Sequence, residues 1–210
     1  MSKPYLKIVT HYEKCLTQYG DTHLGVDWAS ADDAEKRYRV MLDLINEDKQ
    51  VSLLDFGCGT SHLLDYILDK HIANITYTGL DISPEFVKIS QKKYPETNYL
   101  TIDILDLGST LPVFDYIVMN GVFTEKGELS FNQMFDYFRE IIRKVYPSCR
   151  AGLAFNVRSK HVGTEERDLF HLPFDELADF LSQEVTHNYT IRHDYGLQEY
   201  TVYLYPTPRL

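Results

Sequence analysis

The stretch LLDFGCGTSHLL, residues 53–64, decides the fold of this chain. It begins inside a short apolar run, 51–57, that is typical of a buried strand, and a helical segment follows it at once. Gly57 and Gly59 bracket the turn between them, where the backbone must bend sharply and approach a ligand too closely for a Cβ. The pattern predicts a strand–turn–helix unit with Asp55 at the end of its strand.

The same alternation continues along the chain. Apolar runs with little polar alternation indicate strands buried on both faces, at 75–82, 98–104, 114–120 and 151–157. Helices are predicted at about 32–46, at 84–94 with Ser83 as the capping hydroxyl, after the Ser130/Gln133 capping box, and after Pro173. The final segment, 189–206, predicts a hairpin around Gly196 and therefore an antiparallel pair. Together these elements indicate an α/β sheet covered on both faces.

Composition narrows the classes of function. The 210 residues suit a single domain, 1–210, and the net charge of −10 argues against a nucleic-acid partner. The charged N-terminus does not resemble a signal peptide, and no apolar run approaches the ~20 residues of a membrane span, so we expect a cytoplasmic protein. Cys15, Cys58 and Cys149 lie far apart and form neither a CxxC nor a Cys/His ligand spacing, and there is no acidic cluster for magnesium. We therefore expect no disulfide frame and no metal.

The motif D-x-G-C-G-T closely resembles the glycine-rich first motif of class I methyltransferases, which use S-adenosylmethionine (SAM). The resemblance implies that the loop backbone, Phe56, Gly57, Cys58 and Gly59, holds the methionine end of SAM and that Asp55 orients its amino group. A dinucleotide-binding loop would have a third glycine where this chain has His62, which counts against NAD. A tight strand–helix turn without a ligand remains the alternative.

Three further motifs follow in the order that this family requires. Asp81, followed by Ile82, ends the second strand, where a carboxylate can accept hydrogen bonds from a ribose diol. The resemblance places Asp103 near the adenine amine and the Ile104 backbone against the ring, and it places Asn120 and Gly121 beside the sulfonium and the acceptor. It covers about 51–157, with a compatible ending. The expected fold is therefore a Rossmann-like three-layer sandwich with a seven-stranded, mostly parallel sheet that closes with a C-terminal antiparallel hairpin.

The N-terminal segment, 1–31, is expected to be a lid. In similar small-molecule methyltransferases this arm folds over the SAM pocket, excluding water and positioning the acceptor. Trp28 would then flank the cofactor and Arg37 would reach its carboxylate, while Tyr12 and Tyr19 would contact the acceptor. The alternative is that these aromatic residues only anchor the arm to the core.

Two other segments bear on the acceptor. The loop after the fifth strand contains Asn156 and Arg158 together with several basic residues, which would suit an anionic acceptor; acidic neighbours could instead offset this charge. Tyr195 lies at the hairpin tip as a third acceptor contact. If the acceptor must lose a proton, the candidate bases are His23, His161 and His193.

The sequence thus predicts SAM-dependent methyl transfer to a small molecule. The first forty residues and the ending resemble bacterial methyltransferases of surface-polysaccharide loci, which favours O-methylation of a sugar, a nucleotide-linked sugar or a phosphorylated precursor. N-methylation of a small amine, a protein acceptor, a nucleotide-dependent oxidoreductase and a non-catalytic partner subunit with this fold stay open. We expect a small-molecule partner, no nucleic acid and no membrane, and a homodimer is compatible with the sequence.

Overall fold

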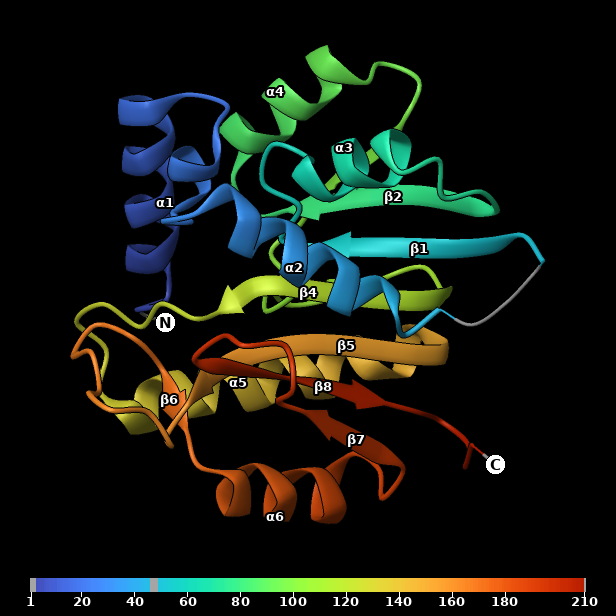
Figure 1. Cartoon of the computed structure of the whole chain (residues 1–210). Coiled ribbons are helices and arrows are strands. Elements are labelled where there is room, and N and C mark those ends of the chain that lie inside the picture. Colours follow the sequence, from blue (N-terminus) through green and yellow to red (C-terminus); the bar gives the residue numbers. More distant parts are fainter. Residues whose placement is uncertain (1–2, 46–48, 210) are drawn as a thin grey trace.

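A computed structural model describes residues 3–45 and 49–209 and shows one sheet with helices on both faces (Figure 1). Its helices are α1 (Leu6–Tyr19), α2 (Ala31–Leu42), α3 (His62–Asp69), α4 (Pro84–Lys93), α5 (Phe131–Val145) and α6 (Phe174–Glu184), with 3-10 turns η1 (His23–Val26) and η2 (Tyr146–Ser148). Its strands are β1 (Val51–Phe56), β2 (Ile75–Asp81), β3 (Asn98–Thr101), β4 (Phe114–Phe123), β5 (Cys149–Ser159), β6 (His171–Leu172), β7 (Tyr189–Arg192) and β8 (Glu199–Leu204).

The strands lie in the order β3-β2-β1-β4-β5-β8-β7, and β6 pairs with β5 beside this path. The neighbours from β3 to β5 are parallel, whereas β8 is antiparallel to both β5 and β7. The prediction of a mostly parallel seven-stranded sheet with a C-terminal antiparallel hairpin is confirmed. β6 was not predicted, because two residues are too short to show a pattern.

Successive strand residues point to opposite faces, and this alternation divides the core in two. Leu54 and Ile117 belong to the cluster that α5 and α6 cover, and Leu53 and Tyr116 belong to the cluster that α2 and α3 cover. Strands buried on both faces explain why their sequences show apolar runs rather than alternation.

Local predictions are corrected at several points. The capping box of Ser130 and Gln133 is present, but Ser83 caps nothing with its hydroxyl, which donates instead to Glu13 Oε1 at 2.6 Å. The helix predicted at 32–46 ends at Leu42; position 46 of that prediction lies outside the described residues. Helix α1 was not predicted at all, because it buries few apolar residues and its apolar stripe is therefore incomplete.

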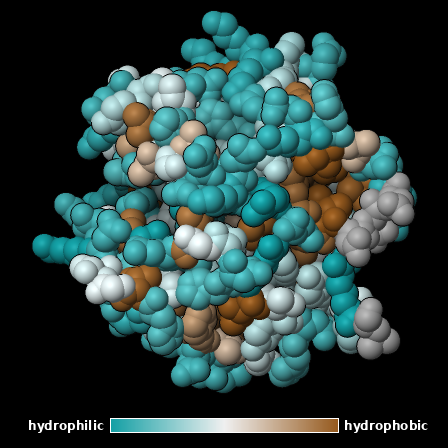
Figure 2. All heavy atoms as spheres, viewed as in Figure 1, coloured by the Kyte–Doolittle hydropathy of each residue, from teal (hydrophilic) through white to brown (hydrophobic). Residues whose placement is uncertain are grey.

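Figure 2 shows a face of the molecule that is mostly hydrophilic, with a hydrophobic area beside the grey residues at the right. Among the described helices, none combines the length and the apolar character that a bilayer span requires.

Candidate active site

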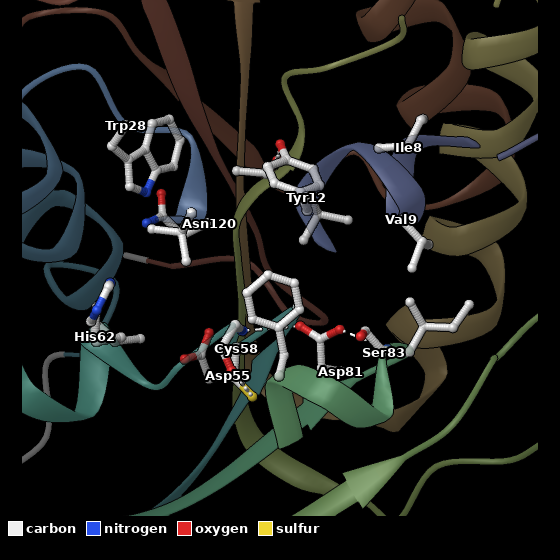
Figure 3. Close-up of a pocket in the computed structure, with 18 of the residues that line it drawn as sticks. Ile8, Val9, Tyr12, Trp28, Asp55, Cys58, His62, Asp81, Ser83 and Asn120 are labelled. Carbon is white, nitrogen blue, oxygen red and sulfur yellow. Dashed lines mark hydrogen bonds between the residues drawn. The ribbon is translucent and has the colours of Figure 1, made fainter. Parts of the chain in front are cut away.

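A cavity of about 890 Å³, counting the open space at its mouth, lies where β1, β2 and β4 end. Its floor is formed by the loop after β1 and by residues at the ends of β2 and β4, and α1 and the η1–α2 connection cover it. In Figure 3, Ile8, Val9, Tyr12 and Trp28 face the floor from the opposite side. The carboxyl edge of a parallel sheet is the usual ligand edge of such folds.

Two glycines shape this cavity. Gly57 has φ +79° and a Cβ there would lie 2.7 Å from Val122 Cγ2. Gly121 has φ +80° and a Cβ would lie 2.7 Å from the Trp28 ring. Both positions combine a left-handed backbone with a close approach, so any other residue would strain the backbone and push the cavity wall apart.

Two buried carboxyl groups lie on the floor. Asp55 Oδ2 accepts a hydrogen bond from the Tyr77 hydroxyl at 2.7 Å. Asp81 accepts backbone N–H bonds from Gly59 at 3.0 Å and from Ser83 at 2.9 Å, one on each oxygen. Burial raises the pKa of Asp55 to about 7 and that of Asp81 to about 6. Each Asp81 oxygen retains a second acceptor position for a ligand hydroxyl.

Asn120 carries an unpartnered polar atom in this cavity. Its Oδ1 is buried and has no hydrogen-bond partner among the described residues. A buried amide oxygen left without a partner costs about 1–3 kcal/mol, so the position favours a ligand that brings a donor. In Figure 3, the Asn120 side chain lies next to Trp28.

The N-terminal arm is held over the cavity by polar contacts. Tyr12 donates its hydroxyl to the Gly121 carbonyl oxygen at 3.3 Å. Lys3 and Tyr5 both donate to Asp103 Oδ2, at 2.6 and 2.8 Å. The predicted contact of Asp103 with adenine is therefore corrected: its carboxylate fixes the arm and does not line the cavity. Phe56 and Ile104 have buried side chains outside the cavity wall, and the backbone contacts predicted for them stay predictions.

A buried polar network lies behind Trp28 and Gly121. Arg37 donates three hydrogen bonds of 2.8–3.0 Å to the fully buried Glu199 on β8. Asn156 donates to Glu199 Oε1 at 2.9 Å and accepts the Gly121 N–H at 2.8 Å.

This network corrects three predictions. Arg37 does not reach into the cavity, because its guanidinium is bound to Glu199 and lies 4.1 Å from the centre of the Trp28 ring. Asn156 and Tyr195 are likewise absent from the cavity wall; the Tyr195 hydroxyl contacts Thr201 at 3.0 Å. Arg37 and Asn156 therefore position Trp28 and Gly121, which do line the cavity.

The three histidines predicted as bases lie away from the cavity. His161 stacks on Phe174 with ring centres 5.1 Å apart, and His193 packs against the same ring at 6.1 Å. His23 belongs to η1 and does not line the cavity wall. Because none of them contacts the space where a ligand fits, their predicted catalytic role is corrected.

The remaining residues predicted to contact the acceptor fall into two groups, one outside the cavity and one that lines it. Arg158 binds Glu166 and Gln198 at 3.3 and 3.2 Å, so neighbours on the surface occupy it. Tyr19 is 43% exposed at the end of α1 and lies outside the cavity wall. Both predicted contacts are corrected. Tyr12 and Gly121 do line the cavity, as do the predicted cofactor residues Asp55, Gly57, Cys58, Gly59, Asp81, Ile82, Asn120 and Trp28. Their roles stay predictions.

Sequence reasoning missed several lining residues. His62 was weighed only as a missing glycine, yet it lines the cavity, and its Nε2 contacts Asp21 Oδ1 at 2.8 Å. Apolar lining residues from α1, α4 and α5 were also missed; they include Ile8, Val9, Phe86 and Tyr137. The helices α4 and α5 were predicted, but no local signal shows which of their residues face a ligand.

Comparison with known proteins indicates the class of protein to which this chain is similar. Residues 54–152, just under half of the chain, match the family model of a methyltransferase domain. A provisionally named methyltransferase of Mycobacterium tuberculosis is 26% identical over 161 residues, which cover 76% of this chain and 95% of that protein. These matches support a SAM-dependent methyltransferase, and the solved structures share the class I fold.

Solved methyltransferase structures share the fold. The magnesium protoporphyrin IX methyltransferase of Synechocystis, crystallised with SAM, aligns with a TM-score of 0.63 at 14% identity over 97% of each chain. The 1,6-didemethyltoxoflavin N1-methyltransferase of Burkholderia thailandensis aligns with a TM-score of 0.61 at 16% identity over 97% of this chain and 90% of its own. At these identities the likeness concerns the fold alone.

The cavity of this methyltransferase fits its cofactor. SAM brings a sulfonium, an ammonium and a carboxylate group and has a net positive charge, and the floor presents two carboxyl groups, Asp55 and Asp81, with no lysine or arginine among the described lining residues. It also brings hydrogen-bond donors, and one of them can pair with Asn120 Oδ1, which has no partner among the described residues. The residues present therefore match a cationic, donor-rich ligand in both charge and hydrogen bonding.

Proposed function

We propose that this methyltransferase transfers the methyl group of SAM to a neutral small-molecule acceptor held between the ends of β1 and β4 and the N-terminal arm. The observation that carries the proposal is the cavity itself. It combines two buried carboxyl groups, an unpartnered amide oxygen and walls of aromatic and aliphatic side chains. These groups suit a cationic cofactor and an acceptor without charge.

Each floor residue has a proposed role. Asp81 accepts hydrogen bonds from the ribose hydroxyls of the cofactor, Asp55 faces its ammonium group, and the glycine loop from Gly57 to Gly59 lies along its methionine part. When bound, SAM supplies an activated methyl group. Tyr12, Trp28 and Asn120 hold the acceptor atom in line with that methyl group, and such positioning contributes much of the rate in a displacement of this kind.

We propose that residues 1–31 act as a lid. The support is the set of hydrogen bonds that hold the arm, from Tyr12 to Gly121, between Ser83 and Glu13, and from Tyr5 to Asp103. Opening the arm would break these bonds together with the stacking of Tyr5 on Tyr137 and the burial of Ile8. The closed arm keeps water from the reacting atoms.

The acceptor is proposed to be neutral for an electrostatic reason. His62 is the one lining residue, among those described, that could carry a positive charge, and burial lowers its pKa below the ordinary value. The backbone N–H groups of the glycine loop are left to the cofactor's own carboxylate, so a phosphate or carboxylate on the acceptor would meet no stable positive side chain beside two acidic groups. O-methylation of a sugar hydroxyl stays a prediction, and this cavity favours neutral sugars over phosphorylated or nucleotide-linked ones.

The first experiment is calorimetric titration of the full chain with SAM, S-adenosylhomocysteine and NAD, each separately. We expect micromolar binding of the first two and none of NAD. Isotope-labelled SAM is then incubated with panels of neutral sugars, aromatic alcohols, amines and phosphorylated sugars, and label transfer is measured. Transfer only to phosphorylated sugars would overturn the neutral-acceptor proposal, and binding of NAD alone would overturn the cofactor.

SAM affinity is expected to depend on pH. The carboxyl groups of Asp55 and Asp81, with pKa values of about 7 and about 6, must lose their protons to face a cationic ligand. Affinity is therefore full only well above pH 7 and is lost as the pH falls through 7 and 6, by roughly 10- to 100-fold between pH 7.5 and pH 5.5. Titrations across this range test the expectation. Asp55→Asn should flatten the profile, and a flat profile in the unaltered protein would contradict the assignment.

Asn120→Ala is expected to have opposite effects on the free and the bound protein. It removes a buried oxygen without a partner, so the thermal midpoint of the free protein should not fall. It also removes the acceptor that a ligand donor would use, so SAM affinity or kcat/KM should fall by about tenfold. Thermal unfolding with and without SAM, together with initial rates, measures both. A lower midpoint with unchanged affinity and rate would show that Asn120 has only a structural role.

A further inference from the structure

Three side chains with different donor atoms converge on the N-terminal arm, outside the cavity described above. His11 Nε2 lies 2.7 Å from Asp27 Oδ2 and 3.8 Å from Cys15 Sγ, and the three donor atoms all lie within 4.8 Å of one another. We propose that His11, Cys15 and Asp27 bind a divalent zinc-class cation that fixes α1 to the η1–α2 connection within the arm. Sequence analysis expected no metal, because the i, i+4 spacing of His11 and Cys15 has meaning only on a helix and α1 was not predicted.

Two backbone elements fix these donors. His11 and Cys15 are one helical turn apart on α1 and therefore project from the same face. Asp27 directly follows η1, with φ 60°, and its N–H donates to the Leu24 carbonyl oxygen at 3.1 Å. A cation held by all three would join α1 to the η1–α2 connection.

The spacing suits tetrahedral zinc. Zinc binds nitrogen, sulfur and oxygen at about 2.0–2.3 Å, so donor atoms in a tetrahedral site lie roughly 3.4–3.6 Å apart. The His11–Cys15 separation of 3.8 Å is close to this value, and the His11–Asp27 hydrogen bond of 2.7 Å would open by less than about 1 Å. A set of imidazole, thiolate and carboxylate favours zinc over magnesium or calcium, which prefer oxygen donors. Three protein ligands leave the fourth position to water.

The surroundings are negatively charged. Glu125 lies within electrostatic range of Asp27, and the charges of Glu166 and Asp168 act on it as well. Of the charged groups that act on Glu125, His11 is the one that counters the repulsion between these carboxylates. A bound cation would offset this repulsion, which adds to the attraction of the site for a positive ion.

The cation would have a structural role and would not act on the substrate. His11 and Asp27 are exposed, so a metal between them lies on the solvent side of the arm. Their chain neighbours Tyr12 and Trp28 line the cavity on the other side. Fixing His11 to Asp27 therefore fixes the relative position of these two cavity residues.

The test uses the full chain, stripped with a chelator and then titrated with Zn²⁺ in competition with a chromophoric chelator. Co²⁺ serves as a second probe, because a cobalt–thiolate bond gives a charge-transfer absorption band. We expect one ion per chain and a thiolate band that Cys15→Ser abolishes, which distinguishes Cys15 from the buried Cys58 and Cys149. Circular dichroism confirms that each variant is folded.

Matched variants decide the outcome. Cys15→Ser and Asp27→Asn should each weaken Zn²⁺ binding by at least about tenfold, whereas His187→Gln, an exposed histidine elsewhere, should leave it unchanged. Zinc should also slow proteolysis of the arm in the unaltered protein and not in Cys15→Ser. Equal Zn²⁺ affinity in all variants, or no thiolate band in the unaltered protein, would overturn the proposal. Neither measurement involves SAM, so failure of the methyl-transfer proposal would leave this result standing.

Discussion

Replacing Glu199 by alanine is expected to lower the free energy of unfolding by about 3–5 kcal/mol, the usual cost of removing one partner of a buried ion pair. Arg37 would keep its charge in a site that is only 8% exposed, and Asn156 would lose an acceptor. Urea unfolding followed by circular dichroism measures the change. The loss is large because the desolvated guanidinium has no other carboxylate to bind.

The matched control is Glu35→Ala. Glu35 pairs with Lys70 at 2.6 Å, but about half of its side chain is exposed, so the loss should stay below about 1 kcal/mol. The double variant Arg37→Met with Glu199→Leu removes both charges and should recover much of the stability. A Glu199→Ala loss as small as that of Glu35→Ala would show that the pair does not hold the wall behind Trp28.

Replacing Asp81 by alanine is expected to weaken SAM binding by about 1.5–3 kcal/mol, or roughly 10- to 150-fold, the range for hydrogen bonds to a charged group. The substitution removes the proposed acceptor of the ribose hydroxyls and also releases the Gly59 N–H, which Asp81 holds at 3.0 Å. Calorimetric titration with SAM and S-adenosylhomocysteine at pH 7.5 measures it, because the Asp81 carboxyl is mostly ionised there.

Asp115→Ala controls for the loss of a carboxylate at the other edge of the sheet. Asp115 accepts two hydrogen bonds from Ser52, at 2.8 Å from the backbone and 2.7 Å from the hydroxyl. Its removal should lower stability and leave SAM affinity unchanged. If both variants weaken SAM binding equally, the effect of Asp81 reflects general destabilisation of the sheet.

The cavity floor could be predicted from the sequence because its geometry is a consequence of the fold. Parallel strands end at one edge, so the residues that follow β1, β2 and β4 must meet there. The short segments around Asp55, Asp81 and Asn120 contain both the strand signal and the polar residue. For this reason the sheet and most of the cavity floor could be predicted without information on contacts between distant parts of the chain.

The walls could not be predicted in this way. Arg37 and Glu199 are 162 residues apart, and neither local sequence indicates the other. Once Glu199 binds the guanidinium, the residue that seemed suited to a cofactor carboxylate is no longer free. His161 and His193 were candidate bases because their side chains titrate near neutral pH. Their positions depend on how the hairpin packs around Phe174, and no periodicity in the sequence predicts that packing.

The Arg37–Glu199 pair also sets an order of events during synthesis. The glycine loop is made soon after Arg37, yet the residue that anchors Arg37 behind Trp28 is made 162 residues after it. Until β8 pairs with β5, the indole lacks this support and Asn156 lacks the Glu199 carboxylate that orients it. Completion of the binding pocket is thus delayed until β8 has been made.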